Sequence, residues 1–233
     1  MNSSAANLGT VKCLSFLTAL LAGCGGGGGD AGSPAPPPPP APAACVASPP
    51  PPAPAPGANP PQVRLTMSNG AGVSGDVVLT LNPAQAPVTT ANVLSYVNAG
   101  FYNCTVFHRH SRDFVMQGGG FAGPVTSTTA FSALKATNPP IALEVGRGLS
   151  NVRLTVAMAR TDLNTATSQF FINLVDNVFL DTSAGGYAVF GSVTAGADVV
   201  TAMRAAPCTS SIVSGSDCLP VPNITITSAV QTR

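Results

Sequence analysis

Charged residues are scarce in this chain of 233 residues: Lys, Arg, Asp and Glu make up 8% of it, and the formal net charge is +1. Ordinary soluble proteins contain about 25% charged residues. The chain has no run of Lys or Arg and no basic face, so its electrostatics give no support for nucleic-acid binding. A charged substrate is not implied either. The composition favours a neutral or apolar ligand, or a site that recognises polypeptide backbone.

Long apolar runs are lacking too, since no stretch approaches the roughly 20 residues that span a membrane as a helix. A shorter apolar run, Cys13–Ala22, follows Lys12 and leads into Gly23-Cys24. A basic residue, about ten apolar residues and a small-residue cleavage site are typical of a secretory signal peptide. The Leu-Ala-Gly-Cys ending resembles the bacterial lipobox, which implies cleavage before Cys24 and a lipid on its sulfur. The alternative is an ordinary secretory signal with a cysteine there by chance.

We therefore predict a lipoprotein-type signal peptide over residues 1–23. The protein is expected to be exported, held in the bacterial cell envelope by a lipid at Cys24, and to face the periplasm. The sequence leaves open which of the two membranes carries the anchor.

Residues 24–61 are predicted to be a disordered tether. Five glycines follow Cys24, and 15 of the 23 prolines lie between Pro34 and Pro61. Glycine runs are flexible and proline runs favour extended polyproline II, so thirty such residues reach on the order of 90 Å at about 3.1 Å each. We interpret the segment as a spacer; a ligand for proline-reading domains is the alternative.

Signatures of covalent and metal catalysis are missing. There is no Gly-x-Ser-x-Gly turn and no phosphate-binding loop, and Gly118-Gly119-Gly120 lacks the dinucleotide-binding spacing. The only histidines, His108 and His110, would share one face of a strand. No Cys-x-x-Cys or paired carboxylates accompany them, so we interpret one as structural and one as a surface residue rather than as metal ligands. No metal or cofactor is expected.

Six cysteines are present. Cys208 and Cys218 bracket a polar loop, and in an oxidising compartment a local disulfide there would stabilise the fold by roughly 2–3 kcal/mol. Cys104 is expected to be partly buried, and Cys45 lies in the tether. A bond between these last two is left open.

Residues 62–233 have the texture of a β-rich domain. Asn69-Gly70 is a strong turn signal between two apolar runs. The predicted strands are Val63–Met67, Val77–Leu81, Thr105–Arg109, Phe114–Gln117, Leu154–Ala159, Phe170–Leu174, Ala188–Val193 and Ile224–Val230. The predicted helices are Thr89–Asn98 and Ala197–Arg204, each followed by a Gly or Pro stop signal. Many short strands and two short helices indicate a closed or nearly closed antiparallel barrel.

Two groups of motifs carry a family resemblance. The first is Phe101-Tyr102-Asn103-Cys104-Thr105-Val106-Phe107-His108-Arg109, with Phe114-Val115-Met116-Gln117-Gly118-Gly119-Gly120-Phe121 after it. The second is Val156-Ala157-Met158-Ala159-Arg160, then Thr167-Ser168-Gln169-Phe170-Phe171-Ile172-Asn173, then Phe179-Leu180-Asp181. Together these resemble the cyclophilin family, especially its bacterial members, over about residues 63–230.

The resemblance implies an all-β (mainly β) fold: a closed eight-stranded antiparallel barrel capped by two short α-helices, with a substrate groove on its outer face. Arg109 matches the catalytic arginine, and Gln117 matches the glutamine that orients it. The other positions implied to contact substrate are Phe114, Val115, Phe171 and Leu180 around the proline, Ala159, Arg160 and Thr161 along the substrate backbone, and Gln169, Phe179 and Tyr187 beside the groove.

Three positions depart from the best-known pattern. Val115 stands where methionine is usual, Phe179 where many eukaryotic members have tryptophan, and Tyr187 where they have histidine. Phe179 removes an indole N–H used by cyclosporin, so the resemblance implies weakened cyclosporin binding.

The resemblance implies a peptidyl-prolyl cis-trans isomerase whose partners are Pro-containing segments of exported proteins. Rotation about an X-Pro bond breaks no covalent bond, so no nucleophile, metal or cofactor is needed. Arg109 would donate a hydrogen bond to the prolyl nitrogen of the twisted amide, because arginine donates without losing its charge. The alternative is a cyclophilin-like chaperone or Pro-peptide binding module without turnover. A monomer is expected.

Overall fold

The computed structural model describes residues 45–55, 57, 59–126, 133–210 and 217–233, all within one compact unit, Ala41–Arg233. The predicted signal peptide, Cys24 and the first part of the predicted tether lie outside the described residues. Within the described part of the chain, no helix has the length and apolarity needed to cross a membrane.

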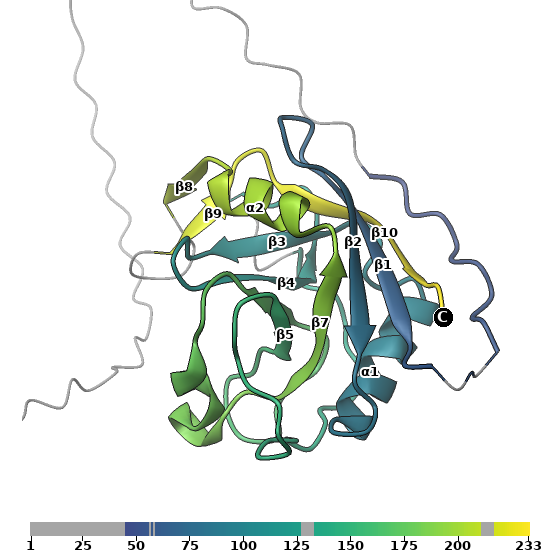
Figure 1. Ribbon diagram of the computed structural model, residues 1–233. Coiled ribbons are helices and arrows are strands. Elements are labelled where there is room, and N and C mark those ends of the chain that lie inside the picture. The colour runs from purple at the N-terminus through teal and green to yellow at the C-terminus, as the bar shows by residue number, and fades with distance from the viewer. Residues whose placement is uncertain (1–44, 56, 58, 127–132, 211–216) are drawn as a thin grey trace, which may run out of the picture. The chain divides into compact units, whose positions relative to one another are not determined.

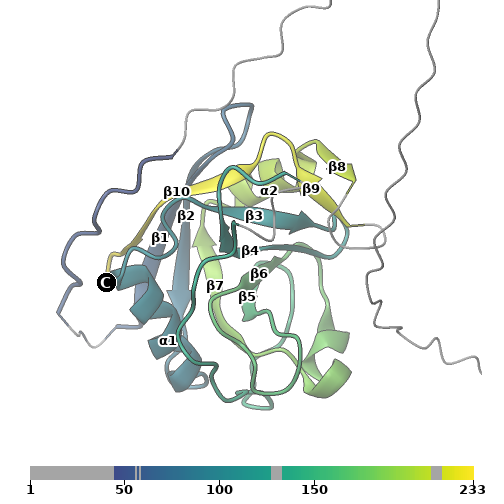
Figure 2. The same cartoon turned by 180° about the vertical axis from the view of Figure 1, so that it is seen from behind.

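Eight antiparallel strands close into a barrel, as predicted (Figures 1 and 2). Neighbouring strands pair in the order β10-β1-β2-β7-β5-β6-β4-β3, and β10 pairs back onto β3 through Ile224 and Phe107. The strands are β1 (Gln62–Ser68), β2 (Ser74–Leu81), β3 (Thr105–His110), β4 (Val115–Ala122), β5 (Thr155–Met158), β6 (Phe170–Asn173), β7 (Val189–Ala195) and β10 (Ile224–Gln231).

A short hairpin outside the barrel was not predicted. It consists of β8 (Cys208–Ser210) and β9 (Cys218–Pro220), and it joins β3 through the pair His110 and Cys218. Three-residue strands are too short to show a two-residue alternation in sequence. The hairpin extends the sheet next to the residue that follows Arg109.

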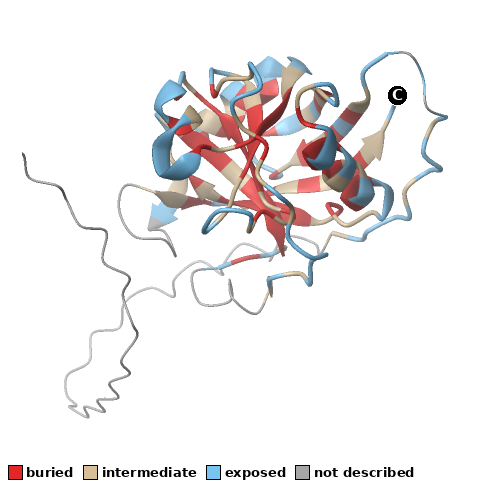
Figure 3. Cartoon of the chain, turned by 90° about the horizontal axis from the view of Figure 1, so that it is seen from below, coloured by how far each residue is buried: buried red, intermediate tan, exposed pale blue. Residues whose placement is uncertain are grey.

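Successive side chains of each strand point alternately into the barrel interior and to its outer face. On β6, Phe170 and Ile172 belong to the interior core, whereas Phe171 belongs to a separate outer cluster. On β4, Met116 points inward and Val115 outward in the same way. The interior appears as buried red ribbon in Figure 3. The outer cluster therefore arises from every second residue of β4, β5, β6 and β7.

Two helices lie at opposite ends of the barrel (Figure 1). α1 (Pro87–Asn98) and α2 (Ala197–Ala205) each place apolar residues in the interior core. α1 begins two residues earlier than predicted, because Pro87 suits the first helical turn and the Glu144 carboxylate accepts the backbone N–H of Thr89 at 2.8 Å. Two short 3₁₀ turns, η2 (Val178–Asp181) and η3 (Ser183–Gly185), precede β7.

Two disulfides occur among the described residues. One joins Cys208 to Cys218 across the β8–β9 hairpin, the pair favoured by the sequence. The other joins Cys45 to Cys104, a pairing that the sequence left open. Just beyond Cys45, the Ser48 carbonyl accepts a hydrogen bond from the Asn103 amide at 2.9 Å. The end of the predicted tether is thus bound to the barrel, whereas residues 24–44 lie outside the described residues.

Candidate active site

A cavity of about 160 Å³ opens on the outer face of the barrel, over β4, β5 and β6. Small-molecule sites usually enclose about 300–1,000 Å³, so this one suits a single ring or side chain rather than a whole cofactor. It is lined by Arg109, Phe114, Val115, Gln117, Ala159, Arg160, Phe171, Leu180 and Tyr187. All nine were predicted as site residues.

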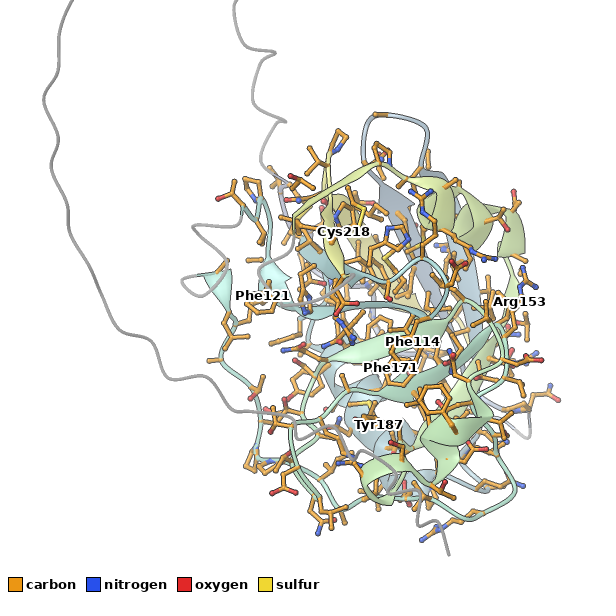
Figure 4. All side chains as sticks on the ribbon, turned by 90° about the vertical axis from the view of Figure 1, so that its left-hand side faces the viewer. Phe114, Phe121, Arg153, Phe171, Tyr187 and Cys218 are labelled. Carbon is orange, nitrogen blue, oxygen red and sulfur yellow. A yellow bond between two sulfur atoms is a disulfide. The ribbon has the colours of Figure 1, made fainter. Side chains whose placement is uncertain are left out.

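The cavity floor is apolar. Phe171 and Val115 are buried there with Leu180, which η2 supplies from outside the strands. The Tyr187 ring meets Phe171 with 5.9 Å between ring centroids, and Figure 4 shows these two side chains with Phe114 on one face. Such a floor can hold a pyrrolidine ring by burial of apolar surface alone.

Arg109 brings a cation to the edge of this floor. β3 has a bulge between Phe107 and Arg109: Phe107 packs in the interior, and Arg109 pairs with Gln117 of β4. Arg109 Nη1 donates to Gln117 Oε1 at 3.1 Å, and its guanidinium carbon lies 5.7 Å from the Phe114 ring centroid. The side chain is 24% exposed, so the guanidinium can still be reached from solvent.

Gln117 is itself held by Gln169, whose Oε1 accepts from Gln117 Nε2 at 2.9 Å. Gln169 lies close against Gly120 of β4: a Cβ at Gly120 would fall 2.7 Å from Gln169 Cγ. A side chain at this position would therefore displace Gln169 from its place beside Gln117. Gln169 acts behind Gln117 and does not line the cavity itself.

Arg160 closes the far side of the cavity. Its Nε donates to the Gly186 carbonyl at 3.0 Å and its Nη2 to the Ala184 carbonyl at 2.7 Å, while its guanidinium carbon lies 4.5 Å from the Tyr187 ring centroid. These contacts tie the η3 turn to the end of β5. The Arg160 side chain is thus committed to the cavity wall.

Buried polar groups support the cavity from below, and the sequence did not indicate them. Asn177 Nδ2 donates to the Phe114 carbonyl at 3.0 Å and to Asn173 Oδ1 at 2.8 Å. Asn173 in turn donates to Asn151, which bonds both Asp181 and the Tyr187 carbonyl. The chain of bonds links three walls of the cavity: the segment before β4, η2, and the segment before β7.

Asp181 anchors this network. Burial by itself raises the pKa of Asp181, but hydrogen bonds from Ser150 and Asn151 outweigh burial, so its pKa lies below the usual value. The carboxylate therefore stays ionised and accepting at neutral pH. This keeps Leu180, one residue before it, on the cavity floor.

Besides Gln169, two more predicted site residues lie away from the cavity lining. Phe179 stacks on Phe114 with ring centroids 5.8 Å apart, but it is 59% exposed and forms an outer rim. Thr161 is exposed, and its backbone N–H donates to Thr165 Oγ1 at 3.2 Å. Contact of either residue with substrate stays a prediction.

The two histidines do not form a pair of metal ligands. His108 packs against Phe121 in a tilted arrangement with 4.5 Å between ring centroids, whereas His110 lies beside Cys218. Both histidines are buried, so the prediction that one of them is a surface residue was wrong: the β9 strand covers His110. Among the described residues, the one group with metal-ligand spacing is His110, Cys208 and Cys218, whose ligand atoms lie within 4.8 Å of one another. The two cysteines are joined as a disulfide, so they are not thiolates.

The buried His108 predicts a pH-dependent stability. Burial, and next the charge of Arg109, lower the pKa of His108 to about 4, against an ordinary value of 6.5. Between pH 6.5 and 4, His108 is protonated in the unfolded chain but stays neutral in the folded chain. The free energy of unfolding should therefore fall as pH drops from 6.5 towards 4, by about 3 kcal/mol in total.

Urea unfolding between pH 7 and 4 measures this loss. The slope should be shallower in His108→Phe, which cannot titrate and keeps a ring against Phe121. Part of the slope should persist, because burial and Arg112 also lower the pKa of His110. An unchanged slope in the variant would contradict the assignment to His108.

Comparisons with known proteins identify the family of the chain. The profile of the family "Cyclophilin type peptidyl-prolyl cis-trans isomerase/CLD" matches residues 63–231. Peptidyl-prolyl cis-trans isomerase A of Dickeya dadantii is 48% identical over 129 residues, which is 54% of this chain and 64% of that protein. Peptidyl-prolyl cis-trans isomerase cyp18 of Streptomyces antibioticus is 46% identical over 162 residues, which is 67% of this chain and 92% of that protein.

A solved structure shares the fold. The cyclophilin type peptidyl-prolyl cis-trans isomerase of Cryptosporidium parvum superposes with a TM-score of 0.57 at 23% identity, covering 74% of this chain and 98% of its own. The barrel, the matched family profile and the bacterial relatives all lead to one conclusion: the chain belongs to the cyclophilin-type peptidyl-prolyl cis-trans isomerase family.

Proposed function

We propose that the barrel is a peptidyl-prolyl cis-trans isomerase that turns X-Pro bonds in exported or envelope proteins. The observation that carries the proposal is the Arg109 guanidinium, held by Gln117 at the edge of an apolar cavity of single-ring size. The curated relatives bear the isomerase name, and a related Cryptosporidium parvum structure was determined in the presence of the dipeptide Ala-Pro.

The arrangement suits rotation about a resonance-stabilised bond. The barrier is about 18–20 kcal/mol, because the amide C–N bond has partial double-bond character. As the amide twists, its nitrogen becomes pyramidal and can accept a hydrogen bond from Arg109. With the proline ring held against Phe171 and Leu180, the carbonyl side can turn.

Because the Arg109 guanidinium is already held in place, it can stabilise the twisted amide more than either planar form of the X-Pro bond. Lowering the barrier by about 7 kcal/mol corresponds to roughly 10⁵-fold acceleration.

A cyclophilin-like module that binds Pro-containing segments without turnover is the second candidate, since the same cavity would bind proline. The two are separated by measuring cis-trans exchange in a short X-Pro peptide by NMR. We expect the protein to accelerate exchange at substoichiometric concentration. Binding of the peptide with exchange at the uncatalysed rate would favour the binding module instead.

We also propose that the protein acts in the bacterial cell envelope, anchored by a lipid on Cys24. Support comes from the lipobox-like ending before Cys24 and from two disulfides, which persist in oxidising compartments such as the periplasm. Mass spectrometry of the mature N-terminus is expected to show a chain that begins at a lipid-modified Cys24. Cleavage elsewhere, or an unmodified Cys24, would contradict the anchor.

Two further expectations belong to this proposal. Phe179 offers no indole N–H at the cavity rim, which supports weakened cyclosporin binding. A monomeric domain held by a lipid on Cys24 would have its cavity within reach of chains that emerge near the membrane.

A further inference from the structure

The guanidinium of Arg109 has a second partner that the family motifs do not contain. Arg109 Nε donates to Asp217 Oδ2 at 2.7 Å, across 108 positions of sequence. The Asp217 side chain is only 10% exposed, and within the described residues Arg109 is its hydrogen-bond partner. A carboxylate this shielded from water binds a guanidinium more strongly than one on an open surface.

The two partners hold different nitrogens of the guanidinium. Gln117 accepts from Nη1 and Asp217 accepts from Nε, so the plane of the group is fixed from two sides. No described residue accepts from Nη2, which leaves that nitrogen to donate to a ligand in the cavity. Asp217 therefore orients the guanidinium and leaves a donor available for substrate.

The hairpin holds Asp217 in place. Asp217 directly precedes Cys218, which is bonded to Cys208 and pairs with His110 of β3. On the other side of Cys218, Leu219 is buried against Val106 and Phe121. β9 has only three residues and a single bridge to β3, so the disulfide is the covalent restraint on the position of Asp217.

We propose that Asp217 is a positioning residue for Arg109, and that the Cys208–Cys218 disulfide makes this positioning, and with it the isomerase rate, dependent on redox state. The inference rests on the proposed isomerase function. A dithiol reductant would transfer two electrons and two protons to the Cys208–Cys218 bond, giving two thiols and the oxidised, cyclic reductant. The hairpin would then loosen, Asp217 would leave Nε, and Arg109 would have only Gln117 to orient it.

Substitution of Asp217 tests the positioning role. We expect Asp217→Asn in the full protein to lower kcat/KM for an X-Pro peptide about ten-fold, with most of the change in kcat, because Asp217 does not line the proline cavity. In an Arg109→Ala background the same substitution should change kcat/KM by less than about two-fold, since a residue that acts through Arg109 has no effect without it.

The matched control is Asp76→Asn, which removes another Asp–Arg pair, Arg64–Asp76, between β1 and β2. It should leave kcat/KM within about two-fold. An Asp217→Asn protein as active as the wild type, or more active, would overturn the proposal. If the wild-type protein leaves X-Pro exchange at the uncatalysed rate, the isomerase function itself fails, which is a different result.

The redox part has its own test. With a chelator present to keep zinc off His110 and the freed thiols, a dithiol reductant should lower wild-type kcat/KM to the Asp217→Asn level. A Cys208→Ser/Cys218→Ser protein should have the low rate with or without reductant. A Cys45→Ser/Cys104→Ser protein should keep the full wild-type response. Equal rates of oxidised and reduced wild type, or a response lost in the Cys45/Cys104 variant, would refute the redox dependence.

Discussion

Replacing Arg109 with alanine is expected to lower kcat/KM for X-Pro isomerisation by about 100- to 1,000-fold. Removal of one preorganised donor to a developing lone pair or charge typically costs this much. The proline cavity would remain, because its floor is made by residues of β4, β6 and η2. The loss should therefore appear mainly in kcat, measured by NMR exchange at several peptide concentrations.

Arg109→Lys is the informative companion. A lysine keeps the positive charge, but its single ammonium cannot bind Gln117, Asp217 and substrate with the planar geometry of a guanidinium. We expect an activity between those of Arg109→Ala and the wild type. Arg64→Ala, which removes an exposed arginine, serves as the control for loss of charge. Equal rates for the wild type and Arg109→Ala would show that catalysis does not pass through this arginine.

The second large effect is expected at Phe171, at the centre of the cavity floor. Phe171→Ala would remove a ring that packs against Val115 and Leu180, at a cost of about 3–5 kcal/mol of folding free energy. Phe171→Leu is milder and leaves a folded protein to assay. It should raise KM for an X-Pro peptide at least several-fold, because the flat aromatic surface under the proline ring is lost.

A matched variant separates binding from stability. Phe190 lies on β7 and is fully buried, but it points into the barrel interior. Phe190→Leu should lower the free energy of unfolding about as much as Phe171→Leu, while KM stays near the wild-type value. If both variants raise KM equally, or neither does, Phe171 is not the floor of the substrate site.

Phe171 and its neighbour Phe170 show what a local sequence pattern can predict about the site. A two-residue alternation predicts that Phe170 and Phe171 face opposite ways. Most predicted strand ends lie within three residues of the observed ones, but β4 runs five residues past Gln117, to Ala122, because the glycines there pack against the aromatic rings of Phe107 and Phe170. The alternation does not say which face is the interior. That depended on the barrel closing through β10 and β3, and here the resemblance to the cyclophilin family supplied the expectation.

The cavity lining was predicted more fully than its support. Nine predicted residues line the cavity: eight belong to the quoted motifs, and Tyr187 was expected from the wider resemblance to the cyclophilin family. The asparagines behind them, Asn151, Asn173 and Asn177, have no motif of their own. Their bonds connect segments that come together only when η2 packs against β6, so no short stretch of sequence records them.

The sequence by itself determined the strand and helix segments, the family and the nine residues around the cavity, since these are written in local periodicity and motifs. Only the tertiary structure decided that Glu144 caps α1, that Cys45 is bonded to Cys104, and that Asp217 meets Arg109. Each of these contacts joins residues more than fifty positions apart. Barrel closure and packing bring these carboxylates and thiols within bonding distance of their partners. No local sequence motif marks them, because each partner lies far away in the chain.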